Sequence, residues 1–270
     1  MIDFAAYPLP AILLASVAAL LTAAEIGHQL GSRAEAEANV TTLEAAILGL
    51  MALMLGFTFS MALARFDERR DAVLAEANSI GTAALRARLL PAPHDLESLK
   101  LFKDYVQIRL DFTATVPTSA EAGAFISHSN DIQEALWKRA RTVAAKDNAM
   151  VPVGVYIQAL NEMFDNQQKR LTAFRNRVPN IVFLALYAIA FVAVGFSGFS
   201  SGLERRQWRA PVYVMCVLSA GVILLIQDID RPGVGYINVD QGPMIETAGG
   251  IAKYLAELQG AAAHPVQGVR

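Results

Sequence analysis

Aromatic and hydroxyl side chains lie next to one another inside an otherwise apolar stretch of the sequence, about residues 45–64. They are Phe57, Thr58, Phe59 and Ser60. Phenylalanine rings can form an apolar constriction, and hydroxyl oxygens can contact an ion that has shed part of its water. Where several copies of such a segment surround an axis, these four side chains are candidates to gate or line a path for a small ion.

Charged residues follow this stretch directly. Arg65 and Arg69 are one helical turn apart, so they can form a positive vestibule at the end of the segment. Asp67 and Glu68 lie between them and oppose that positive field. The sign of a preferred ion therefore depends on which face of the helix points at the path, and the sequence leaves that open.

The same stretch carries small residues at a spacing of three or four. These are Gly49, Ala52, Gly56, Ser60 and Ala64, which fall on one face of a helix. Small residues at this spacing let two helices approach closely in lipid. Helix packing is one interpretation of this face, and lining of a path is the other.

Two ionisable residues, Glu25 and His28, lie about one turn apart near the end of the first apolar stretch. An ionisable residue at membrane depth is a candidate functional site. The alternative is a structural residue at the membrane boundary, where its side chain reaches head groups or water.

The sequence offers no catalytic or metal-binding pattern. It has four histidines and one cysteine, Cys216, and contains no HExxH motif, nucleophile elbow, phosphate-binding loop or dinucleotide-binding turn. We therefore expect no enzyme activity, no metal and no cofactor. The net charge of −2 also gives no sign of a nucleic-acid partner.

Four apolar stretches position these residues, and each has about 17 to 22 residues. They cover about 5–26, 45–64, 181–199 and 210–226. A helix of that length crosses the ~30 Å hydrocarbon layer of a lipid bilayer, where only helical backbone satisfies its own hydrogen bonds. The hydrophobic fraction of 54% and the mean hydropathy of +0.36 agree with a membrane protein. The first stretch lacks a basic leader, so we expect a membrane span rather than a cleaved signal.

The polar middle of the chain reads as helical almost throughout. The second span continues past Arg65 with no glycine or proline before Gly81, which predicts one unbroken helix. Further along, an apolar seam with a single polar member, Gln167, predicts a helix packed at a shallow angle on a neighbour. Glu76 and Asn78 are candidates for a hydrogen bond between helices, with a ligand site as the alternative.

We therefore predict an all-α membrane protein, with four transmembrane helices and a helical-bundle domain inserted between the second and third spans. The expected parts are a first helix pair at 1–64, the bundle at 65–178, a second helix pair at 179–227, and a tail at 228–270. The tail has a turn-rich segment and a short amphipathic helix at about 243–258.

Four spans place the middle and both termini on one side of the membrane. Seven basic residues flank the middle and four lie on the opposite side, which favours a cytoplasmic middle by the positive-inside rule. We expect a multi-pass protein of a bacterial inner membrane. The basic residues are Arg65, Arg69, Arg70, Lys169, Arg170, Arg175 and Arg177 on the first side, and Arg33, Arg205, Arg206 and Arg209 on the other.

Several short stretches together resemble one protein family. They include residues 25–31 (EIGHQLG), 56–62 (GFTFSMA), 65–70 (RFDERR), 175–179 (RNRVP) and 230–232 (DRP). With other pieces between them, they are similar to the four-span bacterial family with a bestrophin-like domain of unknown function. The resemblance implies the four-span topology, and the family's name implies kinship to anion channels.

Two functions follow as hypotheses. The first is a homo-oligomeric ion channel, weakly favoured to conduct anions, whose pore is lined by the second span. The alternative is a non-conducting membrane scaffold or accessory subunit that docks a partner through its helical bundle. A water-filled axis in an oligomer would favour the channel, and dry packing of Gly49, Gly56 and Ser60 would favour the scaffold.

Overall fold

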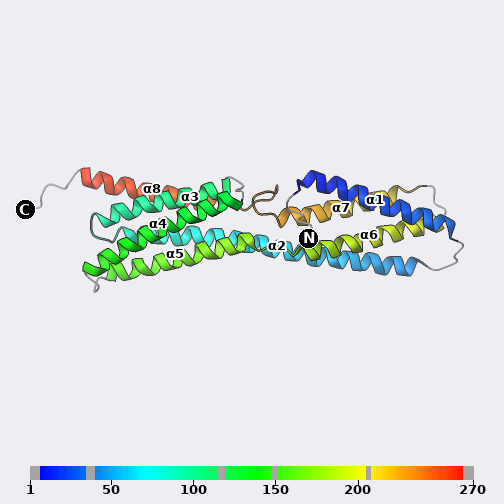
Figure 1. Cartoon of the computed structure of the whole chain (residues 1–270), viewed down its shortest axis with the longest axis horizontal. Coiled ribbons are helices and arrows are strands. Elements are labelled where there is room, and N and C mark those ends of the chain that lie inside the picture. Colours follow the sequence, from blue (N-terminus) through cyan, green and yellow to red (C-terminus); the bar gives the residue numbers. More distant parts are fainter. Residues whose placement is uncertain (1–6, 35–39, 115–118, 147–150, 205–207, 264–270) are drawn as a thin grey trace, which may run out of the picture. The chain divides into compact units, whose positions relative to one another are not determined.

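The computed structural model describes residues 7–34, 40–114, 119–146, 151–204 and 208–263. Within these residues all regular structure is α-helical, which confirms the predicted fold class. The helices are α1 Leu9–Arg33, α2 Val40–Ala87, α3 His94–Ala114, α4 Ser119–Lys146, α5 Val151–Arg175, α6 Asn180–Leu203, α7 Ala210–Ile229 and α8 Gly242–Ala263 (Figure 1).

The helices belong to two compact units. Met1–Asp67 and Asn176–Asn238 form the first, here called the membrane unit, and Glu68–Arg175 and Val239–Arg270 form the second, here called the bundle unit. The helix predicted to run unbroken past Arg65 is confirmed, because α2 continues from Val40 to Ala87 and contributes to both units. The tail is divided, since its turn-rich segment belongs to the membrane unit and α8 to the bundle unit.

The membrane unit contains α1, α6, α7 and the first part of α2. Among the described residues, four helices are long and apolar enough to cross a membrane, as the sequence predicts. Helix α1 lies alongside α6 and α7 (Figure 1). The core of this unit includes the fully buried side chains of Leu20, Leu186 and Ile223 from α1, α6 and α7, together with Met51 and Ala62 of α2.

Glycines bring α1 and α6 into backbone contact. A Cβ atom added at Gly27 or Gly31 of α1 would overlap a carbonyl oxygen of α6. A Cβ added at Gly198 or Gly202 of α6 would overlap a carbonyl oxygen of α1. This is the close approach that small residues permit between helices in lipid. Gly198 and Gly202 of α6 therefore serve the packing of α6 on α1.

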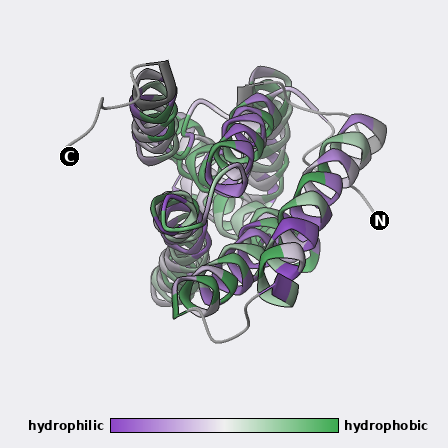
Figure 2. Ribbon diagram, turned by 90° about the vertical axis from the view of Figure 1, so that its left-hand side faces the viewer, coloured by the Kyte–Doolittle hydropathy of each residue, from purple (hydrophilic) through white to green (hydrophobic). Residues whose placement is uncertain are grey.

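The bundle unit contains the second part of α2 with α3, α4, α5 and α8. Its core is a cluster of buried side chains that includes Ile80, Phe102, Leu136, Leu160 and Met244, one from each of the five helices. Figure 2 shows hydrophobic and hydrophilic residues alternating around the helices of the chain, as expected when each helix buries one face. The last helix, α8, is longer than the predicted amphipathic segment.

Candidate functional site

Helix α2 is buried on one side only within the membrane unit. Met51, Thr58 and Ala62 are at most 8% exposed. The opposite side is exposed, and we call it the open face of α2: Gly49, Ala52, Gly56, Phe57, Ser60 and Ala64. A Cβ atom added at Gly49 or Gly56 would meet no atom of the described chain within 4 Å. The predicted packing of Gly49, Ala52 and Gly56 is therefore not made inside the described chain, and it stays a prediction for contacts with another copy.

The four gate and lining candidates divide between the two sides of α2. Phe57 is 62% exposed and lies on the open face with Ser60. Phe59 is half-buried against the core of the membrane unit. Thr58 is buried, and its hydroxyl donates a hydrogen bond of 2.7 Å to the carbonyl oxygen of Met54. Only Phe57 and Ser60 are therefore placed to face a neighbouring molecule, lipid or water.

The charged residues after the span are largely engaged within the chain. Arg69 is buried, Arg65 and Asp67 are half-buried, and Glu68 is exposed. All four take part in interactions with other residues of the chain. Of the four predicted vestibule residues, Glu68 is the one that is exposed.

Glu25 is paired across the membrane unit. Its carboxylate accepts a hydrogen bond of 2.7 Å from Arg209 Nη1 and a second hydrogen bond from the Tyr213 hydroxyl. These contacts join α1 to the start of α7. His28 is half-buried, and its backbone carbonyl packs against Gly202. The arrangement supports the interpretation of Glu25 as a structural boundary residue.

Glu76 is the centre of a buried charge network in the bundle unit. Its side chain is fully buried, and its Oε1 atom lies 2.8 Å from Nε of Arg109. Its Oε2 atom accepts a hydrogen bond of 2.6 Å from Nη1 of Arg170. The two guanidinium groups come from α3 and α5 and share one carboxylate of α2, so the cluster holds an excess of one positive charge.

Polar side chains extend this network to the other helices. Arg170 also donates a hydrogen bond of 3.0 Å to the side-chain oxygen of Gln241, next to the start of α8. Gln133 of α4 donates to the Tyr105 hydroxyl at 3.2 Å and to the side chain of Gln167 in α5. Gln167 is thus a buried, hydrogen-bonded member of the seam. The Tyr105 hydroxyl is also bonded to Glu76 Oε1 at 3.5 Å, so the network joins α2, α3, α4 and α5 and reaches the residue before α8.

Burial sets the charge states in this network. Burial lowers the pKa of Arg170, although the Glu76 carboxylate beside it works in the opposite direction. Burial raises the pKa of Tyr105, and the nearby Glu76 raises it further, so its hydroxyl stays neutral. The sequence singled out Glu76 as a helix-helix contact, but no local signal named Arg109 and Arg170 as its partners. Asn78 is exposed and takes no part in the network.

The sequence model of the bestrophin-like domain matches residues 10–244. The chain belongs to the bestrophin-like family. This confirms the resemblance drawn from its short motifs. With four apolar helices, this bestrophin-like chain is a multi-pass membrane protein that resides in a lipid bilayer.

Solved structures show the same fold. A bacterial bestrophin homologue from Klebsiella pneumoniae superposes with a TM-score of 0.65 at 17% identity, over 92% of this chain and 97% of that chain. A single-substitution variant of that homologue gives a TM-score of 0.64 at 17% identity, over 92% and 98%. Another structure, described as a membrane protein with one substitution, gives 0.63 at 16% identity, over 93% and 98%. No curated protein matches the chain in sequence.

Across the described ranges, no group of three or more histidine, cysteine, aspartate or glutamate side chains is arranged to hold a metal ion. Cys216 is buried in α7. Polar features of the described residues include Ser60 on the open face of α2, the Glu25 pair and the Glu76 network.

Proposed function

We propose that this bestrophin-like protein is a homo-oligomeric ion channel whose pore is lined by the open face of α2. The observation that carries the proposal is this face itself. Small residues run along a membrane helix on the side that no other part of the described subunit covers. Leu50, Leu53 and Leu63 are exposed beside these small residues. The small residues between them let a second protein helix approach closely or leave room for a water-filled path.

Ser60 strengthens the choice of water or protein over lipid. Its side chain is exposed, and its hydroxyl makes no hydrogen bond within the described chain, in contrast to Thr58 on the buried side. A polar group without a partner is unfavourable in hydrocarbon. An adjacent copy of the chain or pore water would satisfy it. Phe57, on the same face, would supply the apolar constriction.

We infer a preference for anions from the buried positive charge of the Glu76 network. The Glu76 network keeps one uncompensated positive charge buried in each subunit, where solvent screens it less than a surface charge. In an oligomer with several subunits around one axis, the electrostatic fields of these buried positive charges would add. Arg65 and Arg69 contribute in the same direction, and Asp67 and Glu68 oppose them. We place the bundle on the cytoplasmic side of a bacterial inner membrane, on the strength of the flanking basic residues.

Conduction is tested with purified protein in planar bilayers under a salt gradient. We expect the reversal potential of the wild-type current to shift toward the equilibrium potential of the anion. We also expect a several-fold larger current for Phe57→Ala, because a wider and less apolar constriction loses its water less readily. Phe59→Ala is the matched control, since Phe59 packs on the core and should affect stability more than current. An intact oligomer without current, in wild type and in Phe57→Ala, would overturn the channel in favour of the scaffold.

A further inference from the structure

Exposed aromatic residues lie at both ends of helix α7 in the membrane unit. Trp208 lies just before the helix and is 76% exposed, and Tyr236 lies in the turn after it and is 80% exposed. The 20 residues of α7 rise about 30 Å at ~1.5 Å per residue. This length matches the thickness of the hydrocarbon layer, so the two aromatic residues lie where the helix leaves that layer.

The turn after α7 has a shape that side chains fix (Figure 1). The buried Asp228 side chain accepts a hydrogen bond of 2.8 Å from the backbone N–H of Tyr236. Asn238 accepts a hydrogen bond from the N–H of Gly233 and donates one to the carbonyl oxygen of Gly235. Gly233 has a φ of +79°, which a glycine adopts without strain. The turn therefore holds Tyr236 in one place.

The turn is attached to the membrane unit at two points. Ile237 packs against the core of this unit. The buried Arg231 donates a hydrogen bond of 2.8 Å to the backbone carbonyl of Tyr7, just before α1. Tyr7 is 57% exposed and Val234, in the turn, is 51% exposed. A single exposed apolar side chain is ordinary on a protein surface, whereas these side chains and that of Tyr236 share one end of the membrane unit.

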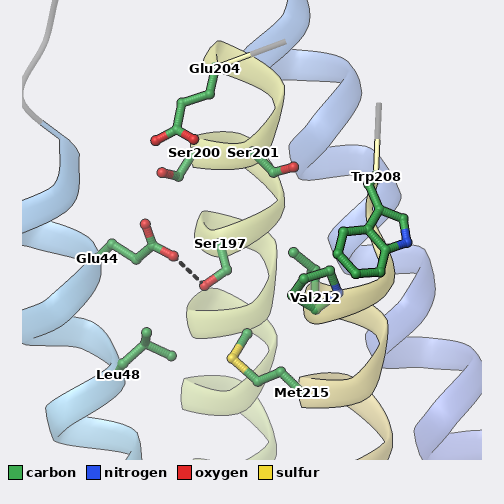
Figure 3. A pocket seen from close by; sticks show the side chains of 10 residues that line it. Glu44, Leu48, Ser197, Ser200, Ser201, Glu204, Trp208, Val212 and Met215 are labelled. Carbon is green, nitrogen blue, oxygen red and sulfur yellow. Dashed lines mark hydrogen bonds between the residues drawn. The ribbon is translucent and has the colours of Figure 1, made fainter. Parts of the chain in front are cut away.

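The opposite end of α7 is also a boundary between apolar and polar surface. Here α2, α6 and α7 form a pocket of about 260 Å³, and the Trp208 ring lies beside Val212 in its wall (Figure 3). The side chains of Glu44 and Ser200 belong to the same lining. Charged and hydroxyl groups of this kind belong outside the hydrocarbon layer, so Trp208 lies at its edge.

We propose that Tyr7, Val234 and Tyr236 contact the head-group region of the lipid bilayer, and that Trp208 does the same on the opposite membrane surface. Tyrosine and tryptophan favour this region, because the ring is apolar while the hydroxyl or N–H group stays hydrogen-bonded. Anchors at both ends of a span determine its depth and tilt in the bilayer. The proposal does not depend on conduction, since these residues lie outside the open face of α2.

The test uses tryptophan fluorescence of the full chain in liposomes. The chain has two tryptophans, which Trp137→Phe and Trp208→Phe remove. Tyr236→Trp then places a single fluorophore in the turn. The liposomes contain phosphatidylcholine with bromine atoms either near the head group or near the end of the acyl chain, and bromine quenches the tryptophans that it contacts.

We expect bromine near the head group to quench Tyr236→Trp at least twofold more strongly than bromine near the chain end. Tyr7→Trp, made in the same background, should behave in the same way. The control is the protein with Trp208→Phe alone, in which the native Trp137 is the fluorophore. Trp137 packs against the core of the bundle unit beside Phe164, so neither lipid should quench it.

Three results for Tyr236→Trp would overturn the proposal. Quenching by acrylamide in the water, with none by either lipid, would place the turn in water. Protection from both lipids and from acrylamide would assign the turn to a contact with another copy of the chain. Equal or stronger quenching by bromine near the chain end would place it inside the hydrocarbon. Circular dichroism and gel filtration establish that each variant is folded; should Tyr236→Trp fail to fold, Val234→Trp reports from the same turn.

Discussion

Glu76 shows how one residue can organise the bundle unit. Its carboxylate is bonded to guanidinium groups that are 33 and 94 residues away in the chain. Taking charges out of water is unfavourable, and the geometry compensates for this only while all partners are present. The sequence predicted a polar contact between helices at this position. It could not name Arg109 and Arg170, because many charged residues of the middle have the same local pattern.

Removing the charge of Glu76 should destabilise the bundle strongly. Glu76→Gln leaves two buried guanidinium groups without a counter-charge, and we expect the free energy of unfolding to fall by about 3–5 kcal/mol. The matched control is Glu257→Gln, which breaks the ion pair with Arg88 at 2.9 Å, where both side chains are about a third or more exposed. That change should lower the free energy of unfolding by less than about 1 kcal/mol. Chemical unfolding in detergent, followed by helical circular dichroism, measures both; equal losses would contradict the role of Glu76.

Alkaline pH should also weaken the bundle. Burial raises the pKa of Tyr156 from 10.0 to about 12. Below pH 10 the folded and unfolded states both keep the proton, so the contribution to stability is complete. As the pH rises from about 10 through about 12, the unfolded chain ionises first and the free energy of unfolding falls, by up to about 3 kcal/mol.

Tyr156→Phe should remove that part of the alkaline loss, and Tyr236→Phe, at an 80% exposed position, serves as the control. The measurement is the unfolding midpoint between pH 9 and pH 12. A wild-type curve and a Tyr156→Phe curve of the same slope in this interval would refute the explanation.

At the scale of the helices, the sequence predicted the spans but did not identify the glycines that pack inside the subunit. The length and composition of each apolar stretch determine whether a helix can cross the bilayer, and these are properties of the stretch alone. The packing of a helix depends also on which other helix lies beside it. Gly49 and Gly56 have the spacing typical of helix contact, yet the backbone contact inside the subunit uses Gly27 and Gly198. Spacing identifies a small face but not its partner.

The two sets of glycines should therefore respond differently to a methyl group. Gly198→Ala places a Cβ onto the carbonyl oxygen of Ala24, so α1 and α6 must separate, at a cost of about 1–3 kcal/mol. Gly49→Ala meets open space within the subunit and raises helix propensity, so the stability of the subunit should be unchanged or slightly higher. Thermal unfolding in detergent gives the comparison. A larger loss for Gly49→Ala than for Gly198→Ala would show that this assignment of the packing is wrong.

For the whole molecule, the sequence was sufficient to predict a four-span helical protein and its family. Both depend on patterns that run through the entire chain, and the match over residues 10–244 confirms them. The pocket formed by α2, α6 and α7 was beyond the sequence, because its members Glu44, Ser200 and Trp208 come from three segments. The same holds for the pairing of Glu25 with Arg209, which are 184 residues apart.

The central claim is that the open face of α2 lines a water-filled path in an oligomer. The single native cysteine, Cys216, is buried and can be replaced by serine, so one new cysteine reports its own surroundings. Ser60→Cys places a thiol on the open face, and Thr58→Cys places it on the buried side of the same helix.

The most direct measurement is the current through each variant in a planar bilayer before and after addition of a charged, water-soluble thiol reagent. Light scattering first verifies that each protein is larger than the 29.1 kDa monomer. We predict that the reagent changes the current of Ser60→Cys several-fold and leaves Thr58→Cys unaffected. An unmodified current in Ser60→Cys, or an equal effect on the two variants, would contradict a pore along this face of α2.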